Sequence, residues 1–206
     1  MIHRRTALAA LASSCVCWLL LALVPIPQAR GSAAPSTVGV VEFYAPTPVP
    51  TFGGFVAESF AAEDLSRLLA RSTAGRLTVV PAATMRRAER DMHWQTADAL
   101  HFERLRALAN AVSADRLVVG WIPLFNVGAG GGSAVPFADD GSEMPTGDVN
   151  IVVQVFDPGA GRLAGETRQE GFALGVTFWQ VATGALHSAL DRSIPELLRL
   201  LGAQGS

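Results

Sequence analysis

The side chains that could do chemistry are few, and their spacing does not assemble a known catalytic or metal-binding motif. The histidines beyond the N-terminal segment are His93, His101 and His187, and no two of them are four residues apart, as a helical metal site requires. No G-x-S-x-G sequence presents a nucleophilic serine on a sharp turn. The sequence therefore predicts no catalytic residues, no cofactor or metal site, and no enzymatic activity.

A long segment rich in glycine and acidic residues occupies positions 126–148. Its glycines lie between two predicted strands, whereas phosphate-binding glycine loops open directly into a helix. Asp139, Asp140 and Glu143 do not follow the residue order of a calcium-binding EF-hand. We expect a flexible loop, and its length makes these three acidic residues a candidate contact region for another molecule.

The predicted fifth strand, 162–172, is polar on both faces. Glu166, Arg168 and Glu170 alternate along one face, and Thr167 and Gln169 lie on the other. A strand buried between two neighbours carries mostly apolar side chains, so this pattern predicts a strand near the edge of the sheet. The charges either prevent unwanted pairing or belong to an edge that a partner strand joins by β-augmentation.

Composition limits the function classes. The 206 residues are 50% apolar, which is enough to build one domain with a hydrophobic core. The 16 basic residues, all arginine, are balanced by 18 acidic ones, and a net charge of −2 excludes a basic nucleic-acid-binding surface. Two cysteines are too few for a disulfide scaffold or a four-thiolate zinc site.

Residues 1–33 have the order of an export signal. The basic residues Arg4 and Arg5 precede an apolar run over 7–24, and small residues follow near Gly31 and Ala33. We predict a cleaved signal peptide and an exported protein of the bacterial periplasm or cell envelope. Cleavage after Ala33 would leave 13 arginines and 18 acidic residues, a net charge of −5, and no cysteine.

Two alternatives for this segment stay open. The apolar run of 18 residues reaches the lower limit for spanning a bilayer, so the segment could remain as a membrane anchor. The stretch Leu11 to Cys15 resembles a lipidation motif with one residue too many, which leaves lipidation at Cys15 as the other alternative. Contact with a membrane is expected only through this segment, if it is uncleaved or lipidated.

Hydrophobic periodicity organises the rest of the chain. After a linker at 34–37, strand patterns occur at 38–43, 77–80, 117–122, 149–156 and 162–172, and helix patterns at 55–71, 84–92, 100–112 and from Thr177 onward. Thr177 and Gln180 have capping-box spacing, and Pro195 should kink or restart the last helix. The order β-α-β-α-α-β-β-β-α predicts a single α/β (α+β) domain over 38–206, with one mixed sheet packed by helices and an antiparallel C-terminal hairpin.

Several strings and the order of the elements resemble a superfamily of bacterial envelope proteins. The strings are Val38–Phe43, Leu65–Leu69, Leu77–Val80, and Leu108–Gly120, in which a helix, a small-residue–Asp turn and an apolar strand ending in glycine follow one another. The superfamily includes the curli-secretion lipoprotein CsgG, the penicillin-binding-protein activator LpoB and the amino-terminal domain of TolB. The resemblance spans residues 38–201 and implies a binding or assembly module, with no catalytic residues to carry over.

These observations together predict an exported, non-enzymatic, protein-binding module of the cell envelope. Its expected partner is another envelope protein or a second copy of the chain. One alternative is a subunit of an oligomeric secretion-type assembly, although 128–147 lacks the alternating pattern of a membrane hairpin. The other is a small-ligand or anion sensor that uses the turn 51–54, just before a predicted helix.

Overall fold

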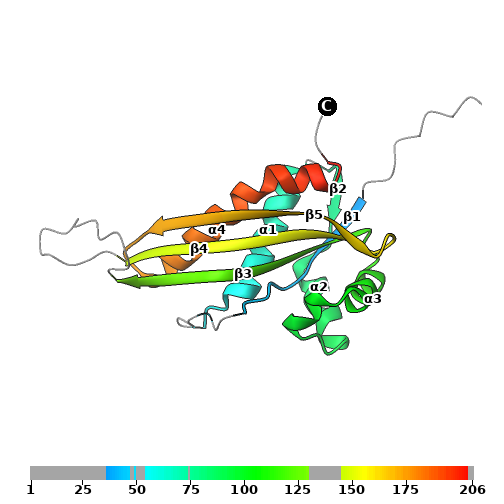
Figure 1. The fold of residues 1–206 in the computed structure, drawn as a ribbon, viewed down its shortest axis with the longest axis horizontal. Coiled ribbons are helices and arrows are strands. Elements are labelled where there is room, and N and C mark those ends of the chain that lie inside the picture. The colour runs from blue at the N-terminus through cyan, green and yellow to red at the C-terminus, as the bar shows by residue number, and fades with distance from the viewer. Residues whose placement is uncertain (1–35, 47–48, 50–53, 74, 130–144, 204–206) are drawn as a thin grey trace, which may run out of the picture. The chain divides into compact units, whose positions relative to one another are not determined.

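The computed structural model describes residues 36–46, 49, 54–73, 75–129 and 145–203 (Figure 1). Residues 35–206 form one compact unit, and every helix and strand described below lies within it. The predicted signal segment 1–33 lies outside the described residues. In the part of the chain that is described, no helix is long and apolar enough to cross a membrane.

The elements follow the predicted order. In sequence they are β1 (Ser36–Val40), α1 (Ala57–Ser72), β2 (Leu77–Val79), α2 (Ala82–Asp91), a 3-10 turn η1 (Thr96–Leu100), α3 (Phe102–Val112), β3 (Arg116–Ala129), β4 (Pro145–Asp157), β5 (Arg162–Leu174) and α4 (Phe178–Leu200). The fold class predicted from the sequence, a single mixed sheet packed by helices, is confirmed.

The five strands form one sheet in the order β2-β1-β3-β4-β5. β1 pairs in parallel with both β2 and β3, whereas β3, β4 and β5 are antiparallel to one another. The C-terminal hairpin is therefore β4–β5, as predicted. Among the described strands, β5 is hydrogen-bonded to β4 alone, which places it at one edge of the sheet.

Two predicted boundaries were wrong. The expected linker 34–37 already contains strand, because Ser36 and Thr37 pair with β2. The expected loop 126–148 is shorter, since β3 continues to Ala129 and β4 begins at Pro145, with Gly128 opposite Thr146. Main-chain hydrogen bonds extend this ladder through residues whose side chains show no strand pattern.

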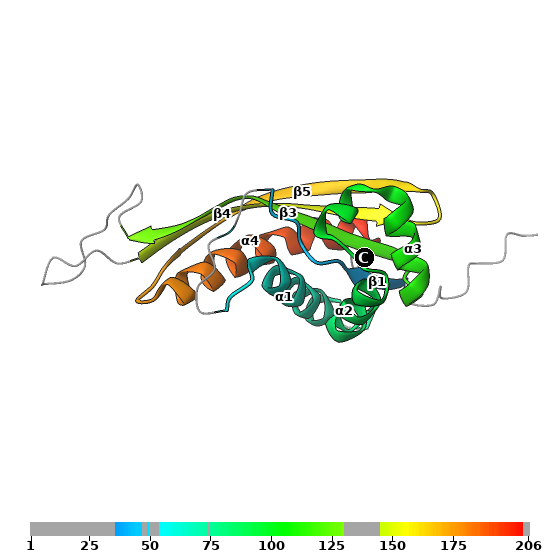
Figure 2. The same cartoon turned by 90° about the horizontal axis from the view of Figure 1, so that it is seen from below.

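Helices cover the sheet on both faces. α1 and α4 lie side by side along one face (Figure 2) and bury the inward-facing side chains of β3 and β4. These side chains alternate along each strand: Val118, Ile122, Val149, Ile151, Val153 and Val155. α2 and α3 form a second, smaller core with Leu117, Val119 and Phe156 on the other face, near the β4–β5 turn. The rest of that face is left without a helix.

The C-terminal helix begins as predicted and continues further than predicted. The main-chain N–H of Gln180 donates to the Thr177 hydroxyl over 3.2 Å, and the Gln180 side chain accepts from the Thr177 N–H over 3.3 Å. The expected restart at Pro195 was wrong, since α4 is one helix from Phe178 to Leu200. Proline removes one helical hydrogen bond, but Ile194 and Leu197 on either side are buried and hold both halves on the sheet.

Replacing Thr177 with alanine is expected to lower the free energy of unfolding by about 1 kcal/mol, because the first turn of α4 loses its cap. Thr183→Ala is the matched control, since this hydroxyl donates to the Trp179 and Gln180 carbonyls within the helix and caps no main-chain N–H. We expect the control to change stability by less than about 0.5 kcal/mol. Urea denaturation of the two variants measures the difference, and equal effects would contradict the capping role.

Candidate protein-interaction surface

The β4–β5 turn fixes which side chains of β5 lie on which face. The Asp157 carboxylate accepts the Ala160 N–H over 2.9 Å, and Gly161 adopts a left-handed conformation with φ 63°. This is the turn that the composition of 157–161 predicts. The register then runs from Asp157 opposite Arg162 to Thr146 opposite Leu174. The register shifts once, between the pairs Val155–Gly165 and Phe156–Leu163. From Glu166 to Leu174, the even-numbered side chains of β5 are placed on the face away from α4.

Glycines bring α4 into direct contact with β5. A Cβ atom on Gly171 would lie 1.9 Å from the main-chain oxygen of Ala185, and one on Gly165 would lie 2.4 Å from Leu200. At Gly171 the near atoms belong to the α4 backbone, so only glycine leaves room there, whereas at Gly165 the near atoms belong to the movable end of the Leu200 side chain. β5 is therefore hydrogen-bonded to β4 on one side and packed on the α4 backbone beneath it. These contacts fix the position of the strand whose other edge is free.

The three charged residues predicted from the sequence are exposed on this edge strand. The side chain of Arg168 is 74% exposed and that of Glu166 is 41% exposed. The Glu166 carboxylate accepts from Gln154 over 2.9 Å and from Arg168 over 3.0 Å, and these hydrogen bonds, the one from Gln154 first, lower the pKa of Glu166. Glu166 is therefore ionised at neutral pH and already ordered by its neighbours.

Apolar side chains lie on the same face, and our reading of the sequence missed them. Phe172 and Leu174 of β5 and Leu124 of β3 are each about 45% exposed, which is uncommon for large apolar residues on a monomer's surface. The sequence contains the signal, because Phe172 and Leu174 have the same parity as Glu166. Phe172 is the last residue of the predicted strand 162–172, and extending that strand by two residues would have added Leu174 to the same face.

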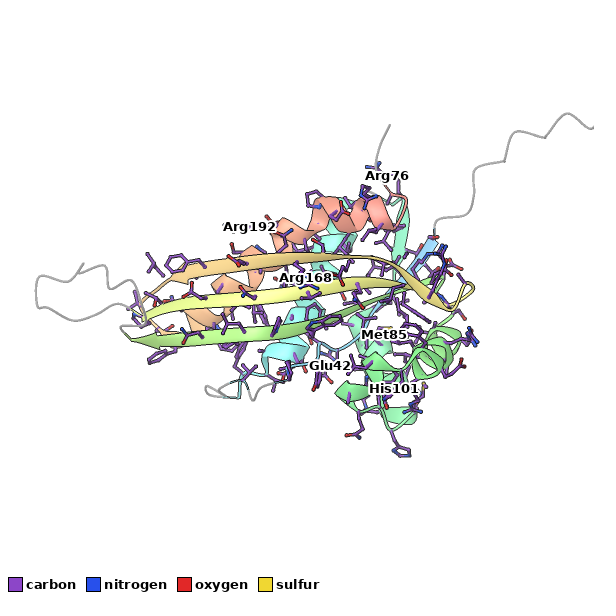
Figure 3. The ribbon with its side chains drawn as sticks, in the orientation of Figure 1. Glu42, Arg76, Met85, His101, Arg168 and Arg192 are labelled. Atoms are coloured by element: carbon purple, nitrogen blue, oxygen red, sulfur yellow. The ribbon has the colours of Figure 1, made fainter. Side chains whose placement is uncertain are left out.

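A shallow hollow lies beside the charged residues of β5. Its lining comes from β3, β4, β5 and α4 and includes Pro123, Asn150, Val152, Arg168, Glu170 and Arg192. The Arg192 guanidinium donates to the main-chain carbonyl of Glu170 over 3.0 Å. Figure 3 shows Arg192 beside β5, on the side away from β4. A side chain of α4 thus occupies a main-chain acceptor that a paired strand could use.

The other predicted contact residues cannot be placed. Asp139, Asp140 and Glu143 lie outside the described residues, as does most of the turn 51–54. Only its last residue, Gly54, is described, with φ 84°. The structure therefore brings Glu166, Arg168 and Glu170 together on one strand.

The histidines do not form a site with one another. His187 of α4 lies 2.7 Å from the buried Asp64 carboxylate of α1, which also pairs with Arg67 over 3.0 Å. This contact joins the two helices that cover the same face of the sheet. Across the described ranges, no three histidine, cysteine, aspartate or glutamate side chains are grouped so that they could hold a metal ion.

Two carboxylates, the buried Glu89 and the half-buried Glu42, lie close together just beyond the end of β1, a second feature that the sequence does not reveal. The main-chain N–H of Glu42 donates to the Glu89 carboxylate over 3.1 Å, and the Ser59 hydroxyl donates to the Glu42 carboxylate. A small cavity of about 20 Å³ lies beside them, next to Met85 of α2. Burial raises the pKa of Glu89 above its ordinary value of 4.5, so this residue binds a proton more readily in the folded chain.

Replacing Glu89 with glutamine is expected to stabilise the protein at neutral pH. Because the pKa of Glu89 is raised on folding, the native state binds more protons than the unfolded chain, and stability falls as the pH rises through that range. Glutamine keeps an oxygen for the Glu42 N–H and carries no charge. Denaturation at pH 4 and pH 8 should show that the advantage of the variant grows with pH.

The control for this experiment is Glu103→Gln on α3, where the Glu103 side chain is 85% exposed. So exposed a side chain stays in water in both the folded and the unfolded chain, so the control should follow the wild type at both pH values. A Glu89→Gln variant that also follows the wild type would show that burial does not disfavour the charge of Glu89.

The open mixed sheet with helices on both faces defines an α+β fold that solved structures of other bacterial proteins share. Lipoprotein GNA1162 from Neisseria meningitidis matches 79% of this chain and 99% of its own, with 15% sequence identity and a TM-score of 0.50. The hypothetical protein CT253 from Chlamydia trachomatis matches 82% of this chain and 98% of its own, with 14% identity and a TM-score of 0.50. These likenesses show a common fold.

The C-terminal domain of LpoB from Salmonella enterica is another structural neighbour. It matches 69% of this chain and 87% of its own, with 16% identity and a TM-score of 0.41. The resemblance of the sequence to the superfamily of CsgG, LpoB and TolB stays a prediction. No family model matches the sequence, and no curated protein matches it significantly.

Proposed function

We propose that this chain is an exported, non-enzymatic protein of the cell envelope that binds another protein through the edge of β5. One observation carries the proposal: exposed charged and large apolar side chains gather on a strand with only one strand neighbour. A free strand edge supplies main-chain hydrogen bonds to an added strand, and the alternating side chains supply specificity.

The residues around β5 favour binding of a partner strand over the alternative, in which the charges only prevent unwanted strand pairing. Protective edges carry charges that point at an approaching strand, with few large apolar residues beside them. Here Phe172 and Leu174 extend the charged row toward the end of β5. Charged residues then set the register of a partner strand, and the apolar residues supply buried area.

Site-specific photo-crosslinking in cells tests the proposal. A photoreactive residue at position 170, on the β5 edge, should form a covalent adduct with a partner protein. The same residue at position 87 on α2, where the Arg87 side chain is 80% exposed, is the matched control and should form none. Equal labelling from both positions, or labelling from position 87 alone, would count against the β5 edge.

Export is tested separately by mass spectrometry of the protein recovered from cells. The order of residues in the N-terminal segment supports cleavage after Gly31 or Ala33, which would give a new N-terminus at Ser32 or Ala34. Recovery with an acylated Cys15 would replace the cleaved signal by a lipid anchor. An intact Met1 in the cytoplasmic fraction would contradict export.

A further inference from the structure

We infer that the strand added to β5 is β5 of a second copy, antiparallel to the first, around a two-fold axis at Thr167. This inference rests on the proposed function, because it names the partner of the same edge. The charges of β5 carry it. The row Glu166, Arg168, Glu170 alternates in sign and is therefore complementary to its own reverse when it is shifted by one side chain.

Only a few registers keep the two faces of the joined sheet intact. Opposite residues of two antiparallel strands must project to the same face, so a two-fold axis has to pass through a residue rather than between two residues. Near the charged row, the axis can pass through Thr167, Arg168 or Gln169. Each choice sets different side chains opposite each other. The interaction energy of the opposed charges is favourable for some choices and unfavourable for others.

An axis at Arg168 is unfavourable. It would place Arg168 opposite its own copy and Glu166 opposite Glu170, and like charges directly across two strands are destabilising. An axis at Gln169 would pair Arg168 with Glu170 but would set Glu166 opposite Phe172. That arrangement leaves one exposed carboxylate on each chain against an aromatic ring.

An axis at Thr167 sets opposite charges against each other on the open face. Glu166 lies opposite Arg168 of the second copy. The β4–β5 ladder shifts register beyond Gly165, where Val155 pairs with Gly165 and Phe156 with Leu163, so the regular pairing around this axis spans Gly165 to Gln169. The two-fold axis repeats each contact, so Glu166 and Arg168 of the two copies form a group of four charges. Signs alternate within this group, and its net charge is zero.

The face toward α4 also fits this register. Thr167 lies opposite its own copy, and threonine pairs are favourable across antiparallel strands. Gln169 lies opposite Gly165, where the lack of a side chain leaves room.

Arg192 regulates access to this edge. Its hydrogen bond to the Glu170 carbonyl has to break before a second strand can take that acceptor. Arg192→Ala is therefore expected to strengthen self-association, because the competing donor is removed. The sign of this effect is informative, since loss of a surface arginine at a charged interface would ordinarily weaken binding.

Charge exchange tests the pairing and its register. The full-length chain is purified in mild detergent, and its self-association is measured by sedimentation equilibrium. Arg168→Glu alone and Glu166→Arg alone should each weaken dimerisation on the order of tenfold, because both central pairs become like-charged. An equimolar mixture of the two variants should restore the dimer as a heterodimer. The control Arg87→Glu makes the same charge change on α2 and should associate like the wild type.

The register is tested with a third variant. For an axis at Thr167, Glu170→Arg mixed with Arg168→Glu should restore association less well than Glu166→Arg does. The reverse result would overturn the Thr167 axis in favour of Gln169. Thermal unfolding of each variant separates loss of pairing from loss of fold.

A wild-type chain that stays monomeric at high concentration, or variants that associate equally well, would overturn the inference. The proposed function would survive that result if photo-crosslinking from position 170 still captured a different protein. Failure of both experiments would remove β5 as a binding edge altogether.

Discussion

Replacing Gly171 with alanine is expected to lower the free energy of unfolding by about 3 kcal/mol, one of the two largest effects on stability that we predict. The added Cβ would lie 1.9 Å from the carbonyl oxygen of Ala185 and 2.8 Å from the Ala189 nitrogen. Both atoms belong to the α4 backbone, so no side-chain rotation can relieve the overlap. Either α4 has to move away from the sheet or β5 has to bend away from β4.

The control is Gly128→Ala in β3, where an added Cβ meets no heavy atom within 4 Å. Both glycines lie in strands, so the change in strand propensity is matched, and the control should alter stability by less than about 0.5 kcal/mol. Urea or thermal denaturation measures both variants. A Gly171→Ala variant as stable as the control would show that α4 does not pack directly on β5.

Leu186→Ala on α4 is expected to have the second large effect, lowering the free energy of unfolding by about 2–5 kcal/mol. The Leu186 side chain is fully buried between α4 and the sheet, and its removal leaves a cavity. The contrasting variant is Leu174→Ala on β5, which removes the same side chain from a site that is 45% exposed. We expect a loss below about 1 kcal/mol there, because less apolar area returns to water.

The two leucines also separate folding from binding. If the open face of β5 contacts a partner, Leu174→Ala should reduce the photo-crosslinked product from position 170 while the protein stays folded. Leu186→Ala should reduce that product only in proportion to the unfolded fraction, measured by circular dichroism. A Leu174→Ala variant that crosslinks like the wild type would remove the apolar end of β5 from the interface.

The sequence was sufficient to predict features that depend on the residues of one segment alone. The polar residues on both faces of 162–172 predicted an edge strand because a covered strand has to be apolar, and β5 is that edge. Thr177 and Gln180 predicted the start of α4 because a capping box is a local hydrogen-bond pattern. Neither prediction required knowledge of the rest of the fold.

Features that join distant segments could not be predicted. Glu42 and Glu89 are 47 residues apart, and only the packing of α2 beside β1 makes them neighbours. Gly171 resembles any strand glycine in the sequence, and its role depends on the path of α4 beneath it. The outer parts of β3 and β4 were likewise missed, because glycine and asparagine in a ladder give no alternating pattern.

The exposed row of charges on β5 could be predicted from the sequence, but the contacts that hold these side chains in place could not. Glu166, Arg168 and Glu170 share a face by strand parity alone. The hydrogen bond from Gln154 and the position of Arg192 depend on how β4 and α4 meet β5. These contacts turn an exposed row of charges into an ordered surface with one occupied main-chain acceptor.

Amide hydrogen exchange tests the central claim most directly. The full-length chain is compared at high dilution in detergent and in the complex recovered from the envelope. We predict slower exchange in the complex for residues 162–174 of β5, with residues 82–91 of α2 unchanged. Protection confined to other segments, with β5 exchanging equally fast in both samples, would contradict binding at the β5 edge.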